Sequence, residues 1–137
     1  MSDFNDMNAA IIDEFRANGG KVGGYFEGAR VLLLHSTGAK SGEERIAPVV
    51  YRPVGDSYAI FASKGGAPTN PAWYHNLVAN PEASIEVGTE TVPVVARVVT
   101  GDERTAIWEP QKEEFPSFAA YEEKTTREIP VVVLDPA

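Results

Sequence analysis

One short segment of the chain, TGAKSGEER (37–45), combines the residue types that bind phosphate and carboxylate groups. Lys40 and Arg45 supply two positive charges, and Gly38 and Gly42 would let backbone amides converge on an anion. The segment is not a Walker A loop, because that motif needs a further glycine at a fixed distance before Gly-Lys-Ser/Thr. The pattern predicts an anion-binding turn, with an ordinary solvated loop as the alternative.

A second segment, SKGGAPTNPAWYHN (63–76), places a lysine beside bare backbone. Lys64 follows an apolar run, and Gly65 and Gly66 allow the chain to approach a ligand with no side chain in between. Two loops that each follow a strand, and that each carry lysine beside glycine, could flank one anionic ligand.

The rest of this second segment predicts the start of a helix. Asn70 can serve as its N-cap, and Pro71 suits the first helical position. Trp73 and Tyr74 would lie on the apolar face of the helix, where core packing is the simplest reading. Asn76 is harder to explain as core, because a buried amide must find hydrogen-bond partners.

The elements that must position these segments are mostly strands joined by hairpins. Apolar runs between turn residues predict strands at 29–36, 46–53, 58–63, 83–88, 91–100 and 129–135. Helical spacing predicts helices at 7–17, 71–80, 102–114 and 115–124. Pro48, inside the second run, indicates an edge position or a bulge. Because strands and helices do not alternate, we expect a mainly β (α+β) fold: one domain, 1–137, forming a small antiparallel barrel with peripheral helices.

The composition narrows the class of ligand. Twelve Lys and Arg against twenty Asp and Glu give a net charge of −8, which argues against nucleic acid and anionic membranes as partners. Residues 1–64 are nearly balanced and residues 65–137 are acidic, so an anion site should draw its cations from the first half. The absence of cysteine excludes disulfides and thiolate metal ligands. With neither a basic leader nor a long apolar run, the protein is expected in the cytoplasm without membrane insertion; peripheral membrane association stays open.

Three stretches taken together resemble a known family: TGAKSGEERIAPVVY, ASKGGAPTNPAWYHNLVANP and the terminal IPVVVLDP. They are similar to the deazaflavin (F420)-dependent nitroreductases of actinobacteria, and the resemblance extends from about Phe15 to Pro136. It implies a small antiparallel split β-barrel of the FMN-binding kind, with coenzyme F420 as the cofactor and no metal. A deazaflavin carries the hydride itself, so the protein would supply binding and orientation.

The resemblance also implies which positions bind the cofactor. The loop and the arginine after it would hold the phosphate and the acidic tail: Ala39, Lys40, Ser41, Gly42 and Arg45. The next segment would run beside the deazaflavin ring: Ile46, Ala47, Pro48, Val49 and Val50. The strand end and glycine turn would reach the middle of the cofactor and its ring: Phe61, Ala62, Ser63, Lys64, Gly65 and Gly66. The helix start would form a wall of the site: Pro71, Ala72, Trp73, Tyr74 and Asn76.

For the acceptor, the resemblance implies aromatic residues on a late helix, joined by one earlier residue: Phe115, Phe118, Tyr121 and Trp73. Tyr121 would be the catalytic residue that helps to protonate the substrate, a role that phenylalanine cannot take. The implied reaction is hydride transfer from reduced F420 to a hydrophobic electrophilic small molecule, such as a quinone, an activated enone or a nitro compound. Ordinary core packing is the alternative for these rings.

Other readings stay open at the level of sequence. The barrel could bind FMN in place of F420, as pyridoxamine-oxidase-like proteins do, or it could carry F420 without a substrate of its own. A homodimer and a monomer both fit the sequence. His35 and His75 are expected to be structural, because a lone histidine on a strand or helix usually is.

Overall fold

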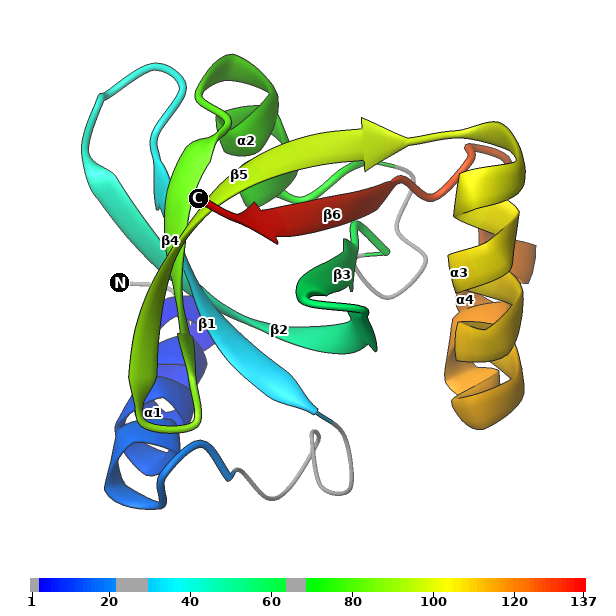
Figure 1. Ribbon diagram of the computed structural model, residues 1–137. Coiled ribbons are helices and arrows are strands. Elements are labelled where there is room, and N and C mark those ends of the chain that lie inside the picture. The colour runs from blue at the N-terminus through cyan, green and yellow to red at the C-terminus, as the bar shows by residue number, and fades with distance from the viewer. Residues whose placement is uncertain (1–2, 22–29, 64–68) are drawn as a thin grey trace.

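Six strands within the described residues close into an antiparallel barrel (Figure 1). The computed structural model describes residues 3–21, 30–63 and 69–137, with side chains from residue 9 onward. The strands are β1 (Val31–Thr37), β2 (Glu44–Val54), β3 (Ser57–Phe61), β4 (Glu82–Val87), β5 (Glu90–Val99) and β6 (Val131–Pro136). Around the barrel they follow the order β1-β2-β3-β6-β5-β4. The predicted small antiparallel barrel is therefore confirmed.

Helices lie outside the barrel wall (Figure 1). The helices are α1 (Asp3–Ala17), α2 (Ala72–Ala79), α3 (Gly101–Glu114) and α4 (Pro116–Lys124). The last two pack side by side on one flank, whereas α2 covers an end of the barrel beside the β1–β2 loop. These helices and strands agree with the predicted ones to within a few residues at their ends.

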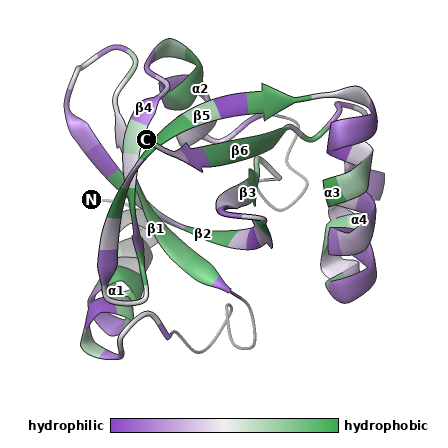
Figure 2. Ribbon diagram, viewed as in Figure 1, coloured by the Kyte–Doolittle hydropathy of each residue, from purple (hydrophilic) through white to green (hydrophobic). Residues whose placement is uncertain are grey.

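Strands buried on both faces explain why several sequence runs are apolar without interruption. Leu32 and Leu34 point into the barrel, where one core cluster gathers residues from all six strands. Their neighbours Val31 and Leu33 face outward and pack against Phe15 of α1. In Figure 2 the green of apolar residues accordingly follows the strands, while α3 and α4 carry much of the purple.

A second apolar cluster lies outside the barrel, beneath α3 and α4. We call it the outer aromatic cluster; its buried members are Ala59, Phe61, Val99, Ile107, Trp108, Phe118, Ile129, Val131 and Val133. Phe115 and Tyr121 pack against it and are half-buried. The late-helix rings singled out from the sequence thus belong to one cluster, together with the ring at the end of β3.

β2 pairs with one neighbouring strand along its first part and with another along its second part. Residues 44–50 pair with β1, and residues 51–54 pair with β3. Pro48 therefore has a partner strand on one side, within the described residues, which confirms the predicted edge position. The arrangement suits proline, because it has no N–H for a second ladder.

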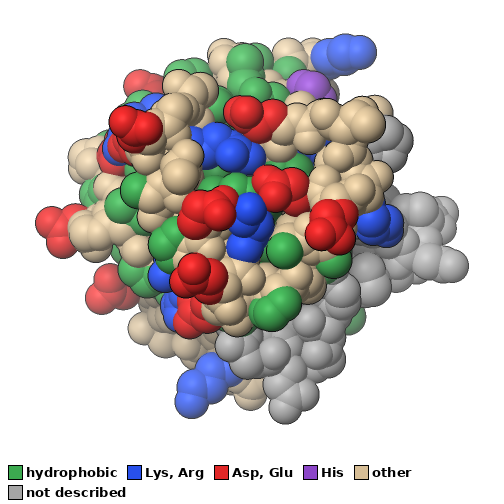
Figure 3. Space-filling model, turned by 90° about the vertical axis from the view of Figure 1, so that its right-hand side faces the viewer, with side chains coloured by type: hydrophobic (Ala, Val, Ile, Leu, Met, Phe, Trp, Pro, Cys, Tyr) green, Lys and Arg blue, Asp and Glu red, His purple; other side chains and the backbone are tan. Residues whose placement is uncertain are grey.

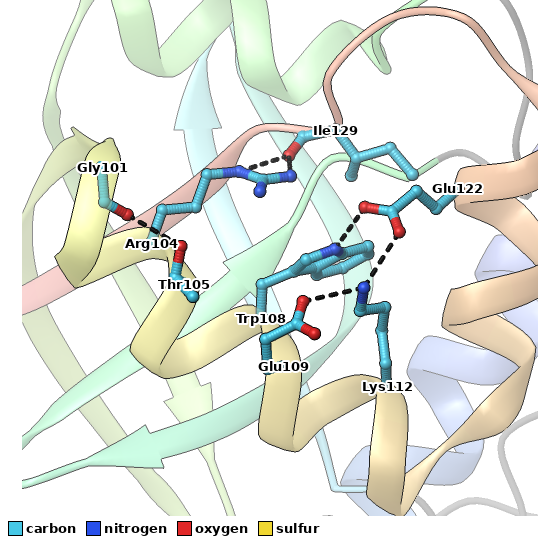
Figure 4. A network of polar contacts seen from close by, with 8 residues as sticks. All are labelled: Gly101, Arg104, Thr105, Trp108, Glu109, Lys112, Glu122 and Ile129. Carbon is cyan, nitrogen blue, oxygen red and sulfur yellow. Dashed lines mark hydrogen bonds and ion pairs between the residues drawn. The ribbon is translucent and has the colours of Figure 1, made fainter.

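Polar contacts fix α4 against α3 (Figure 4). Trp108 Nε1 donates to Glu122 Oε2 over 2.6 Å, and Lys112 Nζ lies 3.0 Å from Glu122 Oε1. Burial alone would raise the pKa of Glu122, but the hydrogen bonds from Lys112 and Trp108 outweigh it and lower the pKa. Arg104 donates twice to the carbonyl of Ile129 and so ties α3 to the segment before β6. Figure 3 shows the outcome, acidic and basic side chains interspersed over this flank.

Candidate active site

The barrel wall opens where the pairing of β2 with β3 ends. The last pair in this direction is Tyr51 with Ile60, and continuing the same register would set Val50 opposite Phe61. No pair forms there between the described residues, so 46–50 and 61–63 border an unpaired stretch, which we call the wall opening. Both segments were predicted to bind the cofactor. The outer edge of 46–50 offers backbone groups that no strand of the described residues uses.

The loop between β1 and β2, residues 38–43, is closed by its own hydrogen bonds. Gly38 N donates to Glu43 O over 2.8 Å, and Gly42 N donates to Gly38 O over 3.0 Å. These two amides are therefore engaged within the loop, and the convergence of its other backbone amides on an anion stays a prediction. Position 42 favours glycine because its φ is +72°, a backbone conformation that other residues rarely adopt. Position 38 favours glycine because a Cβ there would come within 2.5 Å of Ser41 Oγ.

What this loop offers an anion is charge. Lys40 is exposed, and Arg45 at the start of β2 is 59% exposed. The nearest carboxylate to Arg45 is that of Glu43 at 3.5 Å, an exposed ion pair of the kind that contributes little. We call residues 38–45 the two-cation loop, after Lys40 and Arg45, whose charges can bind an anion.

Asn76 joins the two-cation loop to α2. Its side chain is buried with the residue only 8% exposed, and Oδ1 accepts a hydrogen bond from Ala39 N over 3.0 Å. Its Nδ2 donates to Ser36 Oγ over 3.3 Å. The expectation that this amide must find partners is confirmed. The contact also shows that two segments predicted separately, 39–45 and 71–76, lie side by side.

The start of α2 differs from the prediction. Pro71 is its N-cap, and no side chain caps the helix. Asn70 was wrongly predicted as the cap, because its Oδ1 instead accepts a hydrogen bond from Arg127 Nη1 over 2.7 Å. The same guanidinium donates through Nη2 to Ser63 O over 3.0 Å.

Arg127 thus bridges two points that flank residues 64–68. Sequence reasoning missed it, because its partners lie 64 and 57 positions away along the chain and no local pattern marks them. The predicted cofactor-binding residues Lys64, Gly65 and Gly66 lie outside the described residues. Arg127 holds the backbone of Ser63 on one side of that segment and the side chain of Asn70 on the other.

The aromatic residues predicted for the acceptor fall into two places. Phe118 is 7% exposed, and its ring centroid lies 5.5 Å from that of Phe61 and 5.4 Å from that of Tyr121. Trp73 packs instead against the core inside the barrel. Phe61 belongs both to the outer aromatic cluster and to the edge of the wall opening, so the cluster adjoins the predicted cofactor segment. A role for these rings in binding a substrate stays a prediction.

The two histidines, His35 and His75, each contact neighbouring side chains. His35 contacts the carboxylates of Glu86 and Glu44, on the side of the barrel where a hollow of about 280 Å³ is lined by β1 and β4. This pairing fits the structural role expected for His35. His75 is exposed and stacks edge-on against Tyr74. Over the described ranges, no three His, Asp or Glu residues are grouped to hold a metal ion.

A closed barrel with such an opening in its wall defines the class: split-barrel proteins of the flavin-binding kind. HutZ, a haem storage protein from Vibrio cholerae, has this fold at 18% identity and a TM-score of 0.61, over 92% of this chain and 87% of that one. That likeness shows the fold alone. Among the helices of the described residues, none is long and apolar enough to cross a membrane.

The family is also defined. Residues 9–136 match the F420H(2)-dependent quinone reductase family, and the chain belongs to it. An F420H(2)-dependent quinone reductase of Mycobacterium tuberculosis (strain H37Rv) is 41% identical over 124 residues, 88% of this chain and 83% of that protein. Membership implies F420 as the cofactor, as the sequence resemblance had predicted.

Two solved structures are similar over most of the chain. One, of the F420-H2-dependent reductase FDR-A, has 40% identity and a TM-score of 0.71, over 77% of this chain and 93% of that one. The other, described as a domain-swapped dimer, has 34% identity and a TM-score of 0.73, over 96% of both chains.

Proposed function

We propose that this protein transfers a hydride from reduced coenzyme F420 to a quinone. The observation that carries the proposal is the wall opening between β2 and β3. At one end it continues into the two-cation loop, and at Val50 and Phe61 it adjoins the outer aromatic cluster. Membership of the family supports both the hydride source and the acceptor. Cofactor and acceptor would then be held against each other, as direct transfer requires.

The cofactor would lie along the opening with its anionic tail at the two-cation loop. Lys40 and Arg45 would neutralise the tail, and Ala39, Ser41 and Gly42 would contact it. The free backbone edge of Ile46–Val50, together with Phe61–Ser63, would border the ring. Pro71–Tyr74 and Asn76 would form the wall on the side of α2, and Lys64–Gly66 stay predicted contacts. When bound, reduced F420 supplies the hydride, and these residues bind and orient it.

The acceptor would bind on the side of the outer aromatic cluster. Phe115 and Phe118 would supply apolar surface to a flat ring. Tyr121 would hold the proton that the reduced acceptor takes up, since its hydroxyl can donate where phenylalanine cannot. Trp73 would contribute from the α2 side. Activated enones and nitro compounds are proposed as further acceptors on the same surface.

Binding and turnover test the proposal separately. Purified protein is titrated with F420 and with FMN, and the dissociation constants are compared; tight FMN binding without F420 binding would overturn the choice of cofactor. Loss of reduced F420 is then followed by absorbance with menadione, a soluble 1,4-naphthoquinone, and with an enone and a nitroaromatic compound. F420 binding with no turnover of any acceptor would contradict the reductase and favour a carrier.

A homodimer in the cytoplasm is proposed as the working form. The structurally similar domain-swapped dimer supports self-association. Light scattering on protein eluting from a size-exclusion column, with and without F420, measures the molar mass. A mass of one chain would contradict the homodimer. Cell fractionation tests the location.

A further inference from the structure

A buried glutamine beside the proposed acceptor surface has no hydrogen-bond partner. Gln111 of α3 is 0% exposed, and both amide atoms, Nε2 and Oε1, lack a partner in the described part of the structure. Native proteins satisfy most buried polar groups, so an orphaned amide needs an explanation. The other buried side-chain atom without a partner among the described residues is Arg30 Nε.

The Arg30 side chain and the Gln111 backbone both lie close to Phe115, where α3 passes into α4. The Arg30 guanidinium lies 5.9 Å from the centroid of the Phe115 ring, and the backbone of Phe115 donates to Gln111 O over 2.9 Å. One of the two residues with unpaired side-chain atoms therefore lies against this half-buried ring, and the other lies about one helical turn before it. That ring is one of the residues proposed to contact the acceptor.

Gln111 also faces the outer aromatic cluster. It lies three and four positions after Trp108 and Ile107, two buried members of that cluster, and such spacings share a helix face. Trp108 in turn contacts Phe61, with ring centroids 5.7 Å apart, at the edge of the wall opening. The amide therefore lies in apolar surroundings that continue to the proposed cofactor site.

We propose that Gln111 is a specificity-determining residue whose amide hydrogen-bonds a carbonyl oxygen of the bound quinone. The inference rests on the proposed function. An apolar ring with a carbonyl matches an apolar cluster that holds one unsatisfied donor. Because Gln111 is fully covered in the free protein, the side chains over it have to move to admit the acceptor. The orphaned amide is then paired only when a carbonyl ligand is present.

The reduction gives this hydrogen bond an added effect. The quinone gains two electrons and one proton as a hydride from the reduced cofactor, and a second proton from water or Tyr121, which leaves hydroquinone and oxidised cofactor. Negative charge develops on the carbonyl oxygen, and an N–H···O bond strengthens as its acceptor becomes charged. The amide does not give up a proton; it binds the oxygen on which charge develops.

The first test uses the unaltered protein, because Gln111 is the single glutamine of the chain. Labelling glutamine side-chain nitrogen with ¹⁵N gives one NH₂ signal pair that reports on this group alone. Adding menadione to the complex with oxidised F420 should shift that pair, with no turnover. An unmoved signal at saturating menadione would overturn the inference.

The second test is Gln111→Met, which keeps the size of the side chain and removes the amide. The variant should melt at the same temperature or higher, since no partnered group is lost, and kcat/KM for menadione should fall about tenfold or more. The Kd for F420 should not change. Ile85→Met, equally buried but in β4 and outside the outer aromatic cluster, is the matched control and should leave the kinetics unchanged.

Two other results for Gln111→Met would contradict the inference. If Gln111→Met melts several degrees lower, the amide has a partner such as a buried water in the free protein, and the inference is wrong. If its kinetics equal those of the unaltered protein, the amide does not contact the acceptor. In both cases turnover of menadione by the unaltered protein would leave the proposed function standing, so the two failures are distinguishable.

Discussion

Asn76 accepts a hydrogen bond from the backbone amide of Ala39 over 3.0 Å, and this contact joins α2 to the two-cation loop. The carbonyl oxygen of the side chain belongs to one predicted cofactor segment, and the amide belongs to the other. The position of the two-cation loop therefore depends on α2, and a mutation at Asn76 should affect both segments.

Asn76→Leu should weaken F420 binding and destabilise the protein. Ala39 N and Ser36 Oγ would lose their partner, which costs about 1–3 kcal/mol for a group left buried and unpaired. The Kd for F420 should rise about tenfold as the loop shifts. Thermal unfolding and a cofactor titration measure the two effects. Val78→Ala, on the exposed side of the same helix, should change neither; an unchanged Kd in Asn76→Leu would contradict the proposed coupling.

Lys40→Ala and Arg45→Ala should each weaken F420 binding by about threefold to thirtyfold, because each removes one exposed charge-assisted contact to an anion. The loss should shrink at high salt, which screens exposed charges. Titrations at two ionic strengths measure it, with the exposed Lys21→Ala as the control for net charge. If both loop variants bind as tightly as the control, the tail is held elsewhere.

Arg127→Lys should raise the Kd for F420 although the charge is kept. Lysine lacks the planar fork that reaches Ser63 O and Asn70 Oδ1 together, so one of the two contacts is lost. We expect an increase of about threefold to tenfold from one hydrogen bond. Comparing Kd with the melting temperature separates positioning from general stability. A fall in melting temperature with unchanged Kd would indicate a purely structural role.

Tyr121→Phe should lower kcat for menadione more than it raises KM. The ring and its packing against Phe118 are retained, and the hydroxyl proposed to donate the proton is removed. A loss of about tenfold to a hundredfold is expected for one general acid, partly offset by water. Steady-state kinetics across pH measure it. An unchanged kcat would mean that solvent supplies the proton.

Acid should loosen α4 from α3 through Glu122. Its pKa is lowered in the folded protein, so the stabilisation is fully present above the unfolded value of about 4.3 and is lost as the pH falls through the folded value. Glu122→Gln should therefore melt lower than the unaltered protein at neutral pH, and the difference should vanish in acid. A difference that does not depend on pH would show that the charge of Glu122 is not involved.

Much of this fold could be predicted because its signals are local. Apolar runs such as 31–34 and 131–134 mark strands buried on both faces, and Pro48 marks an unpaired edge. Asn76 could be singled out because a buried amide is rare without partners. These inferences need only the residue and its neighbours in sequence.

What could not be predicted depends on residues distant in sequence. Asn70 has the preferred type for a helix cap, yet Arg127 takes its side chain, and a contact across 57 positions leaves no local pattern. The glycine pattern of the loop did not indicate that Gly38 N donates to Glu43 O and that Gly42 N donates to Gly38 O. Gln111 shares a helix face with Ile107 and Trp108, but its polar type gave no reason to expect a side chain that is fully covered.

Because Arg127 holds Ser63 and Asn70 at the same time, the chain between them has to cover a fixed span. Deleting one residue shortens its reach by up to about 3.5 Å, and the two held ends cannot move together to compensate. Beyond the predicted cofactor contacts Lys64–Gly66, the residue types of this connection are then open to change, while its length is not. In a library built on this protein, variants with substitutions at 67 and 68 should survive selection for F420 binding, and those with insertions or deletions between 64 and 69 should be lost.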